Sequence, residues 1–224
     1  WAERDAGDLA VARLFFAGET VYPEYLTDVN VMQCPSDPDS KNYFERYFRE
    51  EPIDPCMFWD VSYQYTGWAI KEHHYLNPGV PANKYPVDFW NDISSEFIIA
   101  VQDTLTTKAQ NAVTSGNWGK VHDEDIQMNT EGTIYRLREG IERFFITDIN
   151  NPARSAQAQS DIVVMQDICW VPAAPSDGQA SFNHVPGGGN VLYMDGHVEF
   201  LKYPSEYPVT STWTVFLTQM DQML

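Results

Sequence analysis

Residues 182–203, FNHVPGGGNVLYMDGHVEFLKY, carry the strongest folding signal in the chain. Two runs of strand-forming residues flank the dipeptide Asp195-Gly196, an arrangement typical of a two-residue β-hairpin turn. Pairing outward from that turn places Tyr193 opposite Val198 in the neighbouring strand. Because side chains alternate along a strand, one face of this hairpin is predicted to enter a core. That face comprises Val191, Tyr193, Val198 and Phe200.

The rest of the chain lacks the regular strand–helix alternation of a parallel α/β enzyme. The clearest helical pattern lies at 92–113, where Ile93, Phe97 and Val101 recur every four residues. The sequence therefore predicts a single α+β domain over 1–224, with a mainly antiparallel sheet packed on helices. The further predicted helices are 40–50, 134–146 and 212–224, and the further predicted strands are 61–70 and 162–165.

The chain is strongly acidic, with 32 Asp and Glu against 14 Lys and Arg and a formal net charge of −18. This charge argues against nucleic acid and anionic membrane surfaces as partners, because both are bound through clustered Lys and Arg. No apolar run approaches the ~20 residues that a membrane-spanning helix needs. A hydrophobic fraction of 43% indicates a folded domain.

Three cysteines, Cys34, Cys56 and Cys169, form no C-x-x-C pair, so neither a zinc ribbon nor a thioredoxin-type site is indicated. Cys34 and Cys56 both lie in Pro- and Asp-rich loop sequence. A disulfide between them would close an interval of about 22 residues and contribute about 3 kcal/mol in the chain-entropy model. Composition alone leaves open whether this bridge forms or all three cysteines remain thiols.

Oxygen-bearing side chains lie at two places that suit calcium. Asp148 and Asn150 belong to the segment TDINNP, and Asp195 lies at the predicted hairpin tip. We expect any bound ion to be a structural calcium held by these three side chains, the alternative being ordinary helix-cap and turn roles. Zinc is less well indicated, because the other candidate ligands match no common zinc spacing. Those candidates are His73-His74, His122 with Asp123 to Asp125, and the set His184, His197 and Cys169.

The sequence contains no nucleophile elbow, phosphate-binding loop, dinucleotide fingerprint or zinc-protease motif. His184 with Asp195 offers at most an acid–base pair, and no nucleophile or oxyanion donor accompanies it. An enzyme is therefore not predicted.

Three motifs resemble bacterial prepilin-like proteins whose C-terminal region carries the H-x9-D-G motif, a family associated with prepilin processing. They are NVLYMDGHV at Asn190–Val198, CPSD at Cys34–Asp37 and YRLREGIERFFITDINNP at Tyr135–Pro152. In this chain ten residues, rather than nine, separate His184 from Asp195.

The resemblance covers most of 22–203 and implies an exported bacterial protein with a pilin-like globular head. Such heads pack an antiparallel sheet against a helical spine, and often end in a loop tied down by a disulfide or a calcium ion. Export favours the Cys34–Cys56 bridge, with Cys169 outside it. The hydrophobic N-terminal helix of prepilins is absent from this sequence, so either it lies upstream of Trp1 or the protein departs from pilin assembly.

The expected function is structural: a subunit of an extracellular filament or secretion pseudopilus that associates with copies of itself. Two aromatic-rich elements are predicted to provide the contacts if they are exposed. They comprise Tyr43, Phe44, Tyr47 and Phe48 in the first, and Trp213, Phe216 and Met220 in the second. The alternative is a monomeric cell-surface module that binds glycans or another protein, with stacking platforms at Trp68, Trp90, Trp118 and Trp170.

Overall fold

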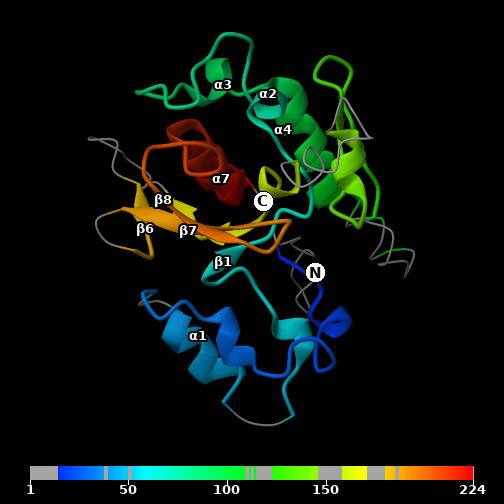
Figure 1. Cartoon of the computed structure of the whole chain (residues 1–224), viewed down its shortest axis with the longest axis vertical. Coiled ribbons are helices and arrows are strands. Elements are labelled where there is room, and N and C mark those ends of the chain that lie inside the picture. Colours follow the sequence, from blue (N-terminus) through cyan, green and yellow to red (C-terminus); the bar gives the residue numbers. More distant parts are fainter. Residues whose placement is uncertain are drawn as a thin grey trace.

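A four-stranded antiparallel sheet lies at the centre of the molecule (Figure 1). The computed structural model describes residues 15–37, 40–49, 52–108, 111, 114, 123–145, 158–170, 180–184 and 187–223. The strands are β1 (Tyr63–Gln64), β4 (Val163–Asp167), β7 (Gly188–Tyr193) and β8 (Val198–Lys202), in the spatial order β1-β4-β7-β8. Every pairing is antiparallel, which confirms the expected α+β class.

Helices and two small hairpins surround this sheet. The α-helices are α1 (Ser40–Tyr47), α2 (Glu72–Tyr75), α3 (Phe89–Asp92), α4 (Ser95–Gln102) and α7 (Ser211–Met223). The 3-10 helices are η1 (Gly18–Thr20), η2 (Val29–Met32), η3 (Pro55–Met57) and η6 (Ile141–Phe144), and a π-helical turn, η4 (Asp103–Thr107), follows α4. The small hairpins pair β2 (Ile126–Gln127) with β3 (Thr133–Ile134), and β5 (Cys169–Trp170) with β6 (Ser181–Phe182). Among the described residues, no helix has both the length and the apolarity needed to cross a membrane.

Two of the predicted helices differ from the structure, and a local feature explains each difference. The helix predicted from residue 92 starts one turn later, because the Ser94 hydroxyl caps α4 by accepting a hydrogen bond from the Phe97 amide at 3.3 Å. The helix predicted at 134–146 is interrupted by Gly140, whose φ is +79°. Its first residue instead belongs to β3, and its helical part is the short η6.

The terminal hairpin forms, but its register differs by one residue from the prediction. The Tyr193 amide donates to the His197 carbonyl at 3.0 Å, and the Gly196 amide donates to the Tyr193 carbonyl at 2.9 Å. The turn therefore contains three residues, with Gly196 in the left-handed region at φ +90°. Because side chains alternate along a strand, this shift turns part of β8 outward.

Because of this register shift, the buried face of the hairpin differs from the predicted one. Val191 and Tyr193 are buried as expected, at 0% and 7% exposure. Val198 and Phe200 were predicted beside them, but they are 60% and 47% exposed. Leu201 takes the inward place on β8 instead.

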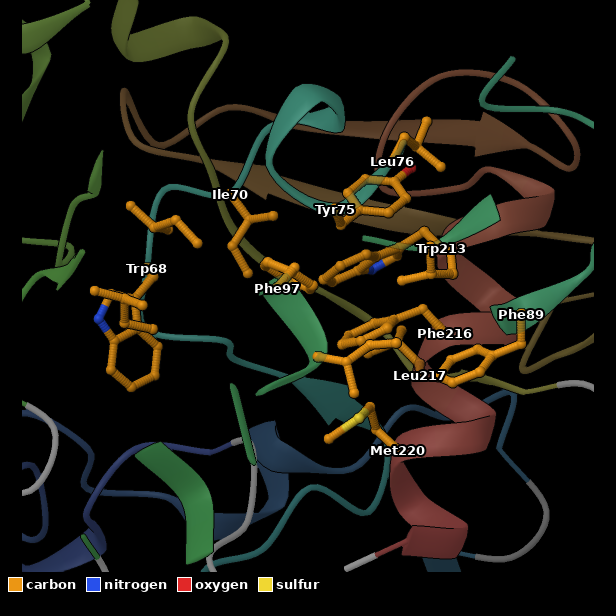
Figure 2. Packing of buried hydrophobic residues seen from close by; sticks show 14 of the residues in the cluster. Trp68, Ile70, Tyr75, Leu76, Phe89, Phe97, Trp213, Phe216, Leu217 and Met220 are labelled. Carbon is orange, nitrogen blue, oxygen red and sulfur yellow. The ribbon is translucent and has the colours of Figure 1, made fainter. Parts of the chain in front are cut away.

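The largest hydrophobic core surrounds α7, and Figure 2 shows how its aromatic side chains stack. Trp213 is 1% exposed and contacts both Tyr75 and Phe216 at ring distances of 5.0 Å. Met220 is buried beside them. The expectation that Trp213, Phe216 and Met220 form a self-association surface is therefore wrong, because α7 turns these side chains into the core of its own chain.

A second core lies around α1, on the opposite side of the sheet from α7 (Figure 1). Phe44 is buried there. Tyr43, Tyr47 and Phe48 are half-buried, and the Tyr43 ring packs against the other two, with the Tyr43 and Tyr47 rings 4.6 Å apart. The self-association surface predicted on this helix is thus also used mainly for intramolecular packing.

Candidate metal centre

Three side chains of metal-binding type meet beside the end of β4, an inner strand of the central sheet. Cys34 follows η2, Asp167 ends β4, and His184 follows β6. One ligand atom from each lies within 4.8 Å of the other two. The His184 Nε2 atom is 3.0 Å from Asp167 Oδ2 and 3.6 Å from Cys34 Sγ.

Asp167 is held in place by β7. Its Oδ2 atom accepts hydrogen bonds from the Asn190 amide at 2.7 Å and from Asn190 Nδ2 at 3.0 Å. Gly189 allows this close approach, since a Cβ at that position would lie 3.1 Å from the Asp167 Cβ. The other carboxylate oxygen, Oδ1, is buried and has no hydrogen-bond partner among the described residues. Burial raises the pKa of this carboxyl, while Asn190 and His184 act to lower it.

The Cys34 thiol is almost fully enclosed, at 2% exposure. Burial raises its pKa, and hydrogen bonds from the Ser36 and Asp37 backbone only partly oppose that effect. The Tyr63 side chain also hydrogen-bonds this thiol, and burial is the main cause that raises the pKa of Tyr63 to about 12. A buried thiol with a raised pKa lacks the properties of a reactive cysteine nucleophile.

The polar groups around His184 compete for one ring nitrogen. Besides Cys34 and Asp167, Asn190 Nδ2 lies 3.0 Å from the same Nε2 atom. A neutral imidazole nitrogen is either one donor or one acceptor, so it cannot satisfy all three neighbours as hydrogen-bond partners. The His184 side chain is 25% exposed, which makes it the most accessible of the three groups.

A cleft of about 420 Å³ adjoins this cluster. One wall comes from the sheet and the other from the segment before α1, and both are mainly apolar. Gln166, Asp167 and Asn190 provide its polar end. The apolar lining residues are Phe15, Phe16, Leu26, Val31, Met32, Tyr63, Met165, Leu192 and Val198.

The predicted disulfide is not formed. None of the three cysteines is bridged, and Cys34 faces His184 while Cys56 is exposed in η3. Cys169 is buried near Gln166 and Thr214, whose polar atoms lie 3.8 Å from its sulfur. The pairing prediction fails because tertiary folding turns Cys34 toward the sheet.

The calcium hypothesis remains a prediction. Asp148 and Asn150 lie outside the described residues. Asp195 is at the hairpin tip as expected, where its Oδ1 atom accepts from the His197 amide at 3.0 Å and lies 2.6 Å from His197 Nδ1. These contacts and the three-residue turn give Asp195 a local role that requires no ion.

The structure does not bring together the zinc-ligand set considered from the sequence, which was His184, His197 and Cys169. His184 meets Cys34 and Asp167, whereas His197 pairs with Asp195 and Cys169 lies on β5. His74 is buried, and its Nδ1 atom accepts from the Lys71 amide at 3.0 Å. His122 lies outside the described residues.

The structure describes the side chains of two of the four tryptophans considered as stacking platforms, and these two differ in exposure. Trp68 is buried at 6% exposure, with its indole N–H donating to the Glu124 carbonyl at 3.0 Å. Trp90 is 69% exposed. Trp118 and the side chain of Trp170 lie outside the described parts of the structure.

Sequence reasoning singled out Cys34 and His184 but missed Asp167 and Asn190. A charged residue at the end of the apolar strand Val163–Asp167 was the available signal, because a buried carboxylate requires a partner. No protein-family description, curated protein or solved structure matches this chain.

Proposed function

We propose that this protein is a structural subunit of an extracellular bacterial filament or pseudopilus, and that β8 provides one contact between its copies. The single observation that carries the proposal is the exposure of Val198 and Phe200 on β8. This strand is the outermost of the four-stranded sheet, with β7 on its one paired side. An outer strand with exposed apolar side chains is a template for pairing with another chain.

The backbone of β8 is suited to pairing with a second β8. The Tyr193 amide donates to the His197 carbonyl, and the Tyr203 amide donates to the carbonyl of Gly187, the residue before β7. Since bonded and non-bonded pairs alternate in an antiparallel ladder, the backbone polar groups of the even-numbered residues of β8 face away from β7. Those residues are Val198, Phe200 and Lys202.

Two antiparallel copies of β8 related by a two-fold axis would place Phe200 opposite Phe200 and Val198 opposite Lys202. This arrangement pairs aromatic rings across the strands and keeps like charges apart at the contact. A two-fold contact alone gives a dimer, so a filament needs a second contact elsewhere. The resemblance of Cys34–Asp37 and Asn190–Val198 to prepilin-like proteins supports the filament and an extracellular location.

The net charge of −18 opposes association at low ionic strength. Added salt should therefore strengthen self-association, because screening acts on charges that lie more than about 10 Å apart at 0.1 M.

The test compares Phe200→Lys with Glu199→Gln by sedimentation velocity. Both changes raise the net charge by one, but only the first alters the apolar face and places like charges opposite each other. We expect concentration-dependent association of the unaltered protein, at least about tenfold weaker association of Phe200→Lys, and little change for Glu199→Gln. A strictly monomeric protein in high salt, with no filaments by negative-stain microscopy, would refute the proposal.

The cleft favours a second candidate, a monomeric binding module for an apolar ligand. Its volume of about 420 Å³ is within the range of small-molecule pockets, about 300–1,000 Å³. Val31, 59% exposed, lines this cleft, whereas Ile99, 65% exposed, does not. Val31→Asp should weaken binding of a fluorescent apolar probe, and Ile99→Asp should not. Equal effects of the two variants would place the probe elsewhere.

A further inference from the structure

We propose that Cys34, Asp167 and His184 form a zinc site that connects three distant segments of the chain. The proposal is independent of self-association, because it rests on groups that lie inside one subunit. Cys34 and His184 are 150 positions apart, and Asp167 reaches both from the end of β4.

Two of the three distances between the ligand atoms are close to those of a tetrahedral zinc site. With zinc bonds of about 2.0–2.1 Å to nitrogen and oxygen and about 2.3 Å to sulfur, tetrahedral ligand atoms lie about 3.3–3.6 Å apart. The observed distance between Cys34 Sγ and His184 Nε2 is 3.6 Å. The distance of 3.0 Å between His184 Nε2 and Asp167 Oδ2 requires only a small outward shift.

Asp167 gives an independent reason to expect a cation. Its side chain is 0% exposed, and its Oδ1 atom has no hydrogen-bond partner in the described parts of the structure. A buried carboxylate without full hydrogen bonding is costly unless a positive charge compensates it. A divalent ion supplies that charge, and it also relieves the competition of three groups for one imidazole nitrogen.

Hydrogen-bond donors surround the sulfur of Cys34. The Ser36 and Asp37 amides act on the sulfur as hydrogen-bond donors, and Tyr63 also contacts it. Hydrogen-bond donors next to a thiolate ligand orient it and stabilise its negative charge. The Asn190 side-chain amide likewise donates a hydrogen bond to Asp167 Oδ2.

The chemical types of the three ligand atoms favour zinc over calcium. A thiolate, an imidazole and a carboxylate suit zinc, whereas calcium requires six to eight oxygen ligands. Three protein ligands leave one tetrahedral position, which water can reach beside the partly exposed His184. The bound ion would stabilise the fold, because it would tie the segment after η2, the end of β4 and the segment after β6 together.

The first experiment titrates the metal-free full chain with Zn²⁺ and, separately, with Co²⁺. We expect one equivalent to bind, a rise in Tm with zinc, and a sulfur-to-cobalt charge-transfer absorption with cobalt. Cys34→Ser should abolish that absorption. Cys169→Ser is the matched control, because it removes another buried thiol that lies outside the cluster.

The second experiment separates metal binding from a purely hydrogen-bonded role. His184→Asn and Asp167→Asn should each weaken zinc binding more than tenfold and abolish the zinc-dependent rise in Tm. His197→Asn, which alters a second His–Asp pair outside the cluster, should leave both unchanged. Cys34→Ser retaining zinc with unchanged affinity would overturn the site, as would zinc failing to raise the Tm of the unaltered chain.

Discussion

The sulfur of Cys34 lies 3.6 Å from Nε2 of His184, although 150 positions separate the two residues. The contact joins the N-terminal part of the chain to the central sheet. It also explains why Cys34 is not positioned for a bridge to the exposed Cys56.

The cysteines should differ sharply in reactivity. Cys56 is exposed, whereas Cys34 and Cys169 are 2% and 3% exposed. Burial also raises the pKa of Cys169 to about 12. We expect a thiol reagent to modify one cysteine rapidly and the other two only after unfolding. Mass mapping should place the rapid modification on Cys56, and a linked Cys34–Cys56 peptide would contradict the structure.

His74 should make the protein less stable in mild acid. Desolvation, aided by His73 and Lys71, lowers its pKa from 6.5 to about 4. The unfolded chain therefore takes up a proton before the native state does. This difference makes no contribution above about pH 6.5, and it destabilises the fold as the pH falls from there toward 4, by up to about 3 kcal/mol.

Urea unfolding across that pH range provides the measurement. His74→Asn retains an acceptor for the Lys71 amide and removes the titration, so its free energy of unfolding should fall less between pH 6.5 and pH 4. His73→Asn should reduce this pH dependence less, since His73 is exposed and is only a secondary cause of the lowered His74 pKa. An equal pH dependence in the unaltered protein and His74→Asn would show that other groups dominate.

Gly188 should tolerate substitution much less than Gly79. Both have positive φ angles, +146° and +83°, so alanine is strained at either position. A Cβ at Gly188 would also lie 2.3 Å from the Leu201 carbonyl oxygen, whereas nothing lies within 4 Å at Gly79. We expect Gly79→Ala to cost about 1 kcal/mol and Gly188→Ala about 3 kcal/mol or more. Equal losses in chemical denaturation would refute this difference.

Trp213 should contribute to the stability of a single chain rather than to association. Trp213→Ala removes a side chain that is 1% exposed and should cost about 3–5 kcal/mol. Trp90→Ala removes one that is 69% exposed and should change stability by about 0.5 kcal/mol or less. Chemical denaturation and sedimentation should be measured on both. Weaker association of Trp213→Ala with unchanged stability would restore the surface role predicted from the sequence.

The sequence predicted elements that depend on neighbouring residues. The short apolar run Ile162–Met165 identified β4, the aromatic spacing at 40–50 identified α1, and Asp195-Gly196 identified the terminal hairpin. Backbone preferences and helix or strand periodicity act over a few residues, so they can be read from the chain itself. These elements were sufficient to predict the α+β class.

Only the tertiary structure decided the hairpin register, the buried faces and the candidate metal centre. The turn signal predicted a two-residue loop, whereas packing of Val191 and Leu201 accompanies the register that has three loop residues and exposes Phe200. Which aromatic face is buried depends on what the rest of the chain places against it, as for Trp213. Likewise, Cys34 approaches His184 and Asp167 only because strands from remote segments pair. The spacing of neighbouring residues in the sequence carries no information on that pairing.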